Sequence, residues 1–170
     1  MKIRIPSWCS NATISINGKP LKAKCKSGTF ASVERIWKVG DQVILDMPME
    51  WRLVLGRERQ AGRAAVMRGP LLFCLNPVQN DSLDKKEVAN FGRIVIDRAS
   101  IENSPVASAA LRPDGIACRL KAGNKPFSIG NMGNLPLTLT EFADPKGKCT
   151  YFRVPDLSEA RPDELSELWK

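Results

Sequence analysis

The fold class is decided by residues 37–48, which read Trp-Lys-Val-Gly-Asp-Gln-Val-Ile-Leu-Asp-Met-Pro. Gly40 belongs to a turn signal between two β-rich segments. After the turn, Val43, Leu45 and Met47 recur at every second position, so in an extended chain they share one face. The proline that follows cannot continue a strand and ends it. This stretch predicts a half-buried β-strand.

The same alternation recurs along the chain. In Lys2–Ile5 two isoleucines alternate with two cations, and in Ala12–Ile16 two isoleucines share a face before Asn17-Gly18, a strong hairpin turn. About ten short strands separated by turns predict an all-β fold, an antiparallel β-sandwich architecture with little helix. Further strands are expected at residues 29–37, 42–47, 51–55, 64–67, 71–75, 93–97, 116–120, 137–142 and 150–154.

The residue composition changes after Asn76-Pro77, where a polar segment follows the closely spaced strand patterns. This change predicts two lobes, residues 1–78 and 79–170. Each lobe is small, so its core would be marginal unless the two pack together. In the second lobe we expect a helical turn at 83–88, a Gly- and Asn-rich loop at 123–134 and a short C-terminal helix within 161–169.

The net charge of +8 lies in the first half of the chain. Residues 1–78 contain 13 Lys+Arg and 5 Asp+Glu, whereas residues 79–170 contain 13 of each. This asymmetry suits a nucleic acid, an anionic polysaccharide or an acidic protein surface. No nucleic-acid-binding motif is present, and Lys22, Lys24 and Lys26 alternate as on a solvated strand face, so we expect no nucleic-acid partner.

Membrane insertion is not expected either, because no apolar run approaches about 18 residues. The segment Met1–Pro6 alternates charges with isoleucines and lacks the apolar region of a signal peptide. Export of this chain is therefore not predicted, and its compartment is left open.

Catalytic chemistry has few candidates. The chain has no histidine, which removes the commonest general base, the Ser-His and Cys-His pairs and histidine-ligated metals. Glycoside hydrolysis needs two carboxyl groups about 5–9.5 Å apart, and nothing in the sequence pairs them. We therefore expect no catalytic residue in this chain. The carboxylates considered are Glu34, Asp46, Glu50, Glu58 and Glu141.

The five cysteines are odd in number and widely spaced, unlike a disulfide framework or a Cys-x-x-Cys metal site. We expect reduced, partly buried thiols, no metal and no cofactor, and one disulfide is left open. Cys74 lies in an apolar strand and is expected to be a structural thiol. The cysteines are Cys9, Cys25, Cys74, Cys118 and Cys149.

Two further groups of side chains suit a binding surface. Trp8, Trp37, Trp51 and Trp169 would form a sugar platform if they shared a face, but their scatter favours packing in the core or between lobes. The second group is an arginine-rich segment, which suits an acidic protein surface, an acidic sugar or a solvated rim. Its members are Arg52, Arg57, Arg59, Arg63 and Arg68.

The segments 3–8, 17–18, 37–48 and 68–74, with weaker support from 137–142 and 151–155, resemble the β-sandwich region after the catalytic barrel in β-L-arabinofuranosidase-like glycoside hydrolases (family 127, DUF1680). The resemblance implies a C-terminal β-sandwich. In that family a zinc-bound cysteine nucleophile lies inside an (α/α)6 barrel. None of the barrel motifs is found in this sequence, so no catalytic or metal-binding role is carried onto it.

The first hypothesis is therefore a non-catalytic accessory β-sandwich that supports a catalytic α/α barrel. A free-standing carbohydrate-binding module is the alternative, with carbohydrate as its partner, and an active hydrolase is the third. The resemblance also implies that the first lobe is truncated at its N-terminus. Open strand edges would then favour self-association, with residues 52–68 in the contact surface.

Overall fold

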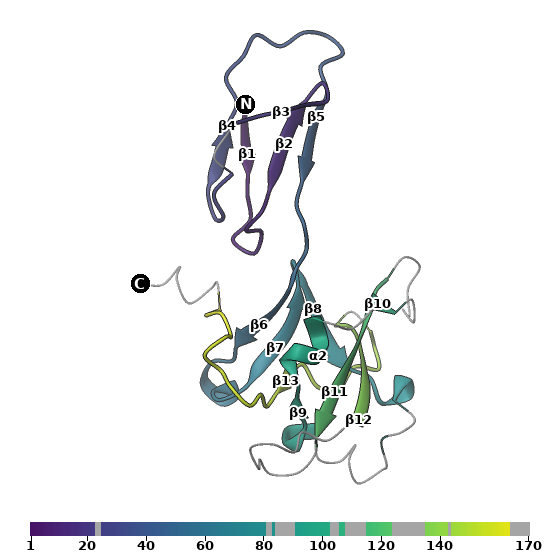
Figure 1. Ribbon diagram of the computed structural model, residues 1–170. Helices are drawn as coiled ribbons and strands as arrows, with labels where there is room; N and C mark the ends of the chain where they lie inside the picture. Colours follow the sequence, from purple (N-terminus) through teal and green to yellow (C-terminus); the bar gives the residue numbers. More distant parts are fainter. Residues whose placement is uncertain are drawn as a thin grey trace. The chain divides into compact units, whose positions relative to one another are not determined.

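The computed structural model describes residues 1–22, 25–80, 83, 91–102, 106–107, 115–123, 135–142 and 144–163. The described chain is mostly strand with little helix, and all paired strands of its sheets are antiparallel. The predicted all-β, antiparallel class is thus confirmed. The chain forms two compact units, Met1–Glu50 and Trp51–Lys170 (Figure 1).

The N-terminal unit consists of two small sheets. One pairs β1 with β4, and the other has the order β3-β2-β5. Side chains from both sheets meet in one apolar cluster with Ile5, Ile14 and Ala31 at its buried centre. The unit is therefore a small two-layered sandwich. Its strands are β1 (Lys2–Arg4), β2 (Thr13–Ile16), β3 (Lys19–Pro20), β4 (Phe30–Ser32) and β5 (Val43–Asp46).

The C-terminal unit is built on one sheet of eight strands in the order β10-β11-β12-β8-β7-β13, with β6 on β7 and β9 on β11. The strands are β6 (Trp51–Leu55), β7 (Ala64–Arg68), β8 (Leu71–Leu75), β9 (Val95–Ile96), β10 (Val106–Ala107), β11 (Ala117–Gly123), β12 (Leu135–Glu141) and β13 (Tyr151–Phe152). Within the described residues of this unit, the helical segments are α2 (Arg98–Glu102) and the 3-10 turns Glu58–Gln60, Pro77–Gln79 and Phe91–Arg93.

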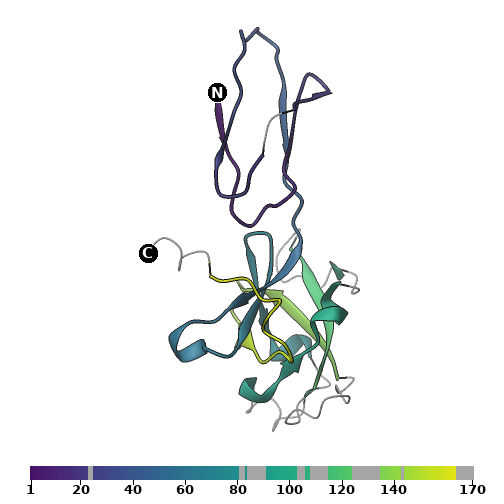
Figure 2. The same cartoon turned by 60° about the vertical axis from the view of Figure 1, so that its left-hand side comes forward.

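This sheet curls until its ends meet. The first half of β8 pairs with β7 and its second half with β12. At the other end of the sheet, β9 pairs with β11. Val95 of β9 also forms a bridge to Arg153, the residue directly after β13. Because β13 pairs with β7, this bridge connects the two ends of the sheet. The backbone contacts therefore run in a closed circuit, and the strands surround a common interior in both views (Figure 1 and Figure 2).

The interior of the curled sheet is the larger apolar core. Phe73, Leu75, Leu139 and Phe152 are fully buried and come from β8, β12 and β13. Burying a side chain of this size stabilises the fold by about 1.5–3 kcal/mol. Since β8 and β12 are separated by about sixty residues of sequence, this core depends on long-range strand pairing.

The boundary between units differs from the expected one at residue 78. Residues 51–75 are strands of the same sheet as 135–141, so they belong to the second unit. The expected strand at 29–37 is shorter, because only Phe30–Ser32 pairs with β1. The expected helical turn at 83–88, apart from Leu83, the loop after Gly123 and the helix after Asp163 lie outside the described residues.

Candidate functional site

The thiols do not form a reactive centre. All five cysteines are free, and Cys9, Cys74 and Cys118 are buried. Burial raises the pKa of Cys74 and Cys149, and it raises the pKa of Cys118 to about 12. A thiol whose pKa is raised holds its proton at neutral pH and is a poor nucleophile or metal ligand. In the described part of the chain, no three Cys, Asp or Glu side chains gather as a metal site.

A buried polar cluster surrounds Asp144. Its carboxylate accepts hydrogen bonds from Asn76 Nδ2, from Thr140 Oγ1 at 2.8 Å and from the backbone N–H of Lys146 at 3.0 Å. Cys74 Sγ lies 3.8 Å from Thr140 Oγ1. These contacts fix the turn after β12 against β8 and occupy the carboxylate, so the cluster is structural.

The other candidate carboxylates are scattered. Glu141 is buried at the end of β12 and accepts a hydrogen bond from the backbone N–H of Ile116 at 3.0 Å. Glu50 accepts from Asn11 Nδ2 at 3.1 Å and from Ser10 Oγ at 3.4 Å. No general acid–base pair is assigned among them. Of the five candidates, Glu34, Asp46, Glu50 and Glu58 are exposed.

The arginine-rich segment is largely engaged within its own unit. Arg52 is buried and donates from Nη2 to the carbonyl of Gly69 at 3.1 Å. Arg57 forms an ion pair with Asp163 at 2.9 Å. The further contacts are from Arg63 Nη1 to Gln60 Oε1 at 3.3 Å and from the Arg68 guanidinium to the Trp51 ring centroid at 5.6 Å. Much of the charge in this segment thus supports the fold.

The tryptophans do not form one platform in either unit. Trp8 is half-buried against the N-terminal core, and Trp51 packs on Phe73 with ring centroids 4.8 Å apart. Trp37 is the exposed exception, in the loop between β4 and β5. Trp169 lies outside the described residues.

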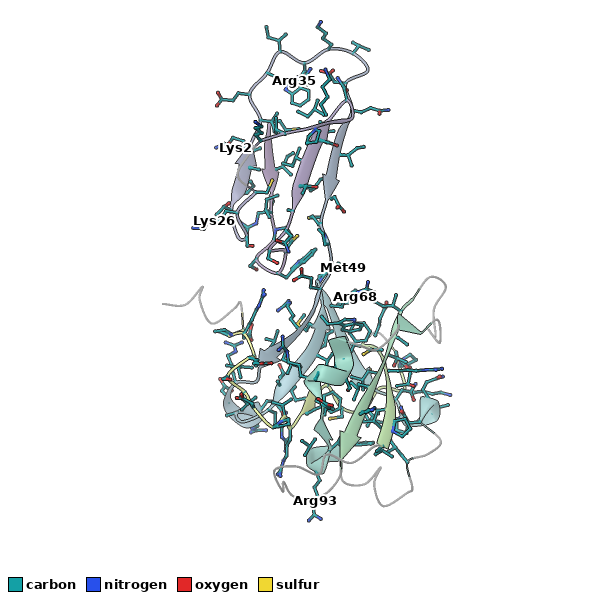
Figure 3. The ribbon with its side chains drawn as sticks, viewed as in Figure 1. Lys2, Lys26, Arg35, Met49, Arg68 and Arg93 are labelled. Carbon is teal, nitrogen blue, oxygen red and sulfur yellow. The ribbon has the colours of Figure 1, made fainter. Side chains whose placement is uncertain are left out.

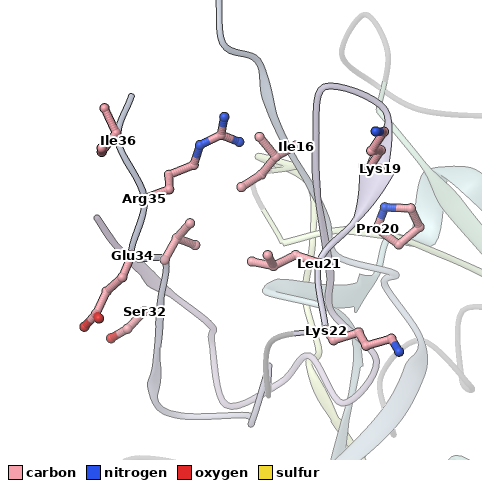
Figure 4. A pocket seen from close by; sticks show the side chains of 10 residues that line it. Ile16, Lys19, Pro20, Leu21, Lys22, Ser32, Glu34, Arg35 and Ile36 are labelled. Atoms are coloured by element: carbon pink, nitrogen blue, oxygen red, sulfur yellow. The ribbon is translucent and has the colours of Figure 1, made fainter. Parts of the chain in front are cut away.

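The candidate site is an open groove in the N-terminal unit, with a volume of about 680 Å³. One wall is the turn and strand at residues 16–22, and the other is the segment 32–36 that continues from β4. Figure 4 shows Arg35 extending towards Ile16, Leu21 pointing into the space between the walls, and Glu34 directed away from it. A cleft of this size falls in the range of about 300–1,000 Å³ that is typical of ligand sites.

A polar network holds the two walls together. Asn17 Nδ2 donates to Asp41 Oδ1 at 2.7 Å, and Asn17 Oδ1 accepts from the backbone N–H of Gln42 at 2.8 Å. Asp41 also accepts from the backbone N–H of Lys38 at 2.9 Å and pairs with Arg35 Nη2 at 3.2 Å. The hydrogen bonds from Asn17 and Lys38 lower the pKa of Asp41. Asp41 is therefore an ionised anchor that orients Arg35.

The loop beside the groove has an apolar and cationic tip. Ile36 is 88% exposed and Val39 is fully exposed. The guanidinium of Arg35 lies 5.3 Å from the centroid of the Trp37 ring, within the range of a cation–π contact. From the sequence, Trp37 is predicted to be a packing residue, and Arg35 has no predicted role. The charged and Gly-containing composition of residues 34–40, which interrupts the strand expected at 29–37, is the sequence feature that indicates an exposed loop here.

The comparisons with known proteins point to one enzyme family. Residues 1–49 match the family model described as "Beta-L-arabinofuranosidase, GH127 middle domain". A non-reducing end β-L-arabinofuranosidase from Bifidobacterium longum subsp. longum is 34% identical over 84 residues, which cover 46% of this chain and 12% of that protein. The matched model describes a middle domain, whereas the resemblance in sequence implies a C-terminal region.

Solved structures show the same fold. A glycoside hydrolase matches with a TM-score of 0.69 and 22% identity over 94% of this chain and 27% of its own. A GH127 β-L-arabinofuranosidase from Geobacillus stearothermophilus T6 matches with a TM-score of 0.65 and 20% identity, covering 90% of this chain and 26% of that enzyme. The chain is thus similar to a part of such glycoside hydrolases and spans about a quarter or less of these relatives.

Proposed function

We propose that this chain is a non-catalytic accessory β-region of a β-L-arabinofuranosidase-like glycoside hydrolase, and that it supports a catalytic α/α barrel. The observation that carries the proposal is the match of residues 1–49 to the middle domain of that family. The relatives are several times longer than the matched part, which leaves room for a catalytic domain elsewhere in their chains.

The state of the polar side chains supports a role without catalysis. Asp144 and Glu141, the buried carboxylates, each accept hydrogen bonds that fix the backbone. The buried thiols of Cys74 and Cys118 have raised pKa values. A catalytic acid, base or nucleophile needs access to a substrate, and these four groups are buried.

The surface of the N-terminal unit supports a partner. The large exposed apolar side chains are concentrated in this unit, and a contiguous patch of such side chains would mark an interaction site. Of the nine large hydrophobic side chains that are exposed in the described chain, seven belong to residues 1–50. They are Met1, Phe30, Ile36, Trp37, Val39, Ile44 and Met49.

The proposal is tested by mixing this chain with the catalytic segment of a GH127 relative from which the matched region has been removed. We expect a one-to-one complex by light scattering and a higher thermal midpoint of the catalytic segment, because a ligand of the native state stabilises it. Ile44→Thr, which keeps a β-branched side chain on the exposed face of β5, should weaken the complex. Val78→Thr, in the C-terminal unit with similar exposure, is the matched control. Absence of a complex would refute the proposed support.

A carbohydrate-binding module is the second candidate function. The groove of the N-terminal unit favours it, since it combines an apolar floor with cations and an exposed indole nearby.

A further inference from the structure

We propose that the groove between residues 16–22 and 32–36 binds an acidic glycan, a polysaccharide chain that carries uronate carboxylates. This inference goes beyond the accessory role, because support of a barrel does not require a ligand in the groove.

The shape of the groove fits a chain. It is open to solvent, so a polymer can enter and leave along it, and its volume of about 680 Å³ accommodates part of a ligand. Its inner surface is apolar, with contributions from Ile16, Leu21 and Val33. Apolar surface of this kind suits the C–H faces of sugar rings better than it suits a hydrated ion.

The cations of the groove fit carboxylates. Arg35 extends from one wall into the space between the walls, whereas Lys19 and Lys22, on the other wall, extend from its outer side (Figure 4). The one acidic side chain of the lining, Glu34, is directed away in the same view. A guanidinium offers a planar fork of donors that matches a carboxylate with two parallel hydrogen bonds. The groove thus holds one guanidinium over its apolar floor, with two flexible lysines at the rim of the opposite wall.

Arg35 is preorganised for this contact. Its Nη2 pairs with Asp41, its plane lies near the Trp37 ring, and about a third of the side chain, 32%, remains exposed. Because Asp41 is itself held by Asn17 and by the backbone of Lys38, the arginine does not have to be ordered when a ligand arrives. Ordering an unrestrained side chain at an interface lowers affinity, so this arrangement favours binding.

Trp37 is the residue directly after this wall and is not itself part of the groove lining. The residue is 39% exposed and lies two positions after Arg35. An exposed indole provides a large, rigid apolar face at low cost in conformational entropy. A sugar ring next to the one whose carboxylate contacts Arg35 can lie on this face.

The charge distribution favours a glycan over a nucleic acid. The N-terminal unit has eight Lys+Arg and four Asp+Glu, a net charge of +4 spread over residues 1–50. Nucleic-acid sites depend on a continuous basic stripe that neutralises many phosphates. Here Glu34 and Asp41 interrupt the positive surface beside the groove. A glycan whose carboxylates are spaced along sugar rings with apolar C–H faces matches this interrupted charge pattern better than a continuous row of phosphates does.

The test measures the affinity of the full chain for polygalacturonate by calorimetry at low salt, with neutral arabinan and poly-L-glutamate as comparison polymers. We expect binding to polygalacturonate, no binding to arabinan and at most weak binding to poly-L-glutamate. Arg35→Gln and Trp37→Ala should each weaken binding about tenfold, the scale of one lost charge-assisted hydrogen bond or aromatic contact. Raised salt should weaken binding as well.

Two further variants separate binding from folding. The double variant Lys19→Gln/Lys22→Gln leaves the Asn17–Asp41–Arg35 contacts intact and should weaken binding about threefold, less than Arg35→Gln, because exposed charges at the rim contribute little each. Lys26→Gln is the matched control, since this exposed lysine belongs to the same unit, does not line the groove and lies apart from Arg35 in Figure 3. Circular dichroism confirms that each variant is folded.

Three results would overturn the inference. They are no binding to polygalacturonate, equal binding to poly-L-glutamate, which would assign the groove to an acidic peptide, and equal losses in the groove variants and in Lys26→Gln. None of these results bears on complex formation with a catalytic segment, so the accessory role is tested separately.

Discussion

Asn17 donates a hydrogen bond of 2.7 Å to Asp41 across 24 residues of sequence, and this contact joins the β2–β3 turn to the loop before β5. Asn17 has a φ of 51° and Gly18 a φ of 75°, the left-handed pair that a tight hairpin turn requires. One residue therefore shapes the turn and, through Asp41, orients the arginine of the groove.

Substitution of Asn17 separates these two roles. Asn17→Gly removes the side-chain hydrogen bonds but readily adopts the left-handed conformation. Asn17→Ala removes the same hydrogen bonds and also disfavours the left-handed conformation. We expect the free energy of unfolding to fall in the order wild type, Asn17→Gly, Asn17→Ala, with the last two about 1 kcal/mol apart. Urea denaturation followed by tryptophan fluorescence measures the order. Equal stability of the two variants would show that the turn geometry does not matter.

Asp144 makes the stability of the C-terminal unit depend on pH. Burial alone would raise its pKa, but hydrogen bonds from Lys146 N–H, Thr140 and Asn76 outweigh burial and hold the pKa below its usual value of 3.8. The ionised carboxylate is therefore preferred in the folded state. Its contribution is complete above about pH 4 and is lost as the pH falls through the lower, folded-state pKa.

The prediction for Asp144→Asn is a smaller loss of stability below pH 4 than in the wild type. At neutral pH the variant should be the less stable protein, and Asp144→Ala should lose about 2–4 kcal/mol, because buried donors left without an acceptor cost about 1–3 kcal/mol each. Urea denaturation between pH 2.5 and 7 measures both effects. An unchanged pH dependence in Asp144→Asn would contradict the role assigned to the cluster.

Gly147 is required by the close approach of Cys74. A Cβ atom at position 147 would lie 2.4 Å from Cys74 Sγ and 3.2 Å from the carbonyl oxygen of Asp144. We expect Gly147→Ala to cost about 1–3 kcal/mol through overpacking. Cys74→Ala removes the sulfur, so the double variant should recover part of the loss, and a double-mutant cycle measures the coupling. Strictly additive effects would rule out the steric explanation.

Cys118 should resist alkylation in the folded protein. With its pKa raised to about 12 by burial, the thiolate fraction at pH 8 is on the order of 10⁻⁴, about a thousandfold below that of a thiol with the usual pKa of 9.0. Peptide mass mapping after iodoacetamide treatment should find Cys118 unmodified until urea is added. Rapid modification in buffer would mean that β11 opens readily.

Local patterns in the sequence predicted much of this fold because strands and turns are local. The alternation of Val43 and Leu45 gave β5, Asn17-Gly18 gave the β2–β3 turn, and Arg68-Gly69-Pro70 separates β7 from β8 as expected. These features depend on neighbouring residues, whose side chains alternate in a fixed way.

Long-range pairing was not accessible in the same way. Nothing local indicates that β8 leaves β7 to pair with β12, or that Arg153 bridges Val95, and these contacts place the unit boundary at residue 50. The groove was missed for the same reason, since its walls are two segments brought together by the Asn17–Asp41 contact.

The central claim is that the chain supports catalysis by a partner and does not itself catalyse. The most direct measurement is the hydrolysis rate of 4-nitrophenyl β-L-arabinofuranoside by the purified chain, by the catalytic segment of a GH127 relative and by their mixture. The account predicts no rate above buffer for the chain alone, and a mixture that keeps its activity at a higher temperature than the catalytic segment alone. Turnover by the chain alone, proportional to its concentration and abolished in a Cys74→Ala or Cys118→Ala variant that is still folded, would contradict it.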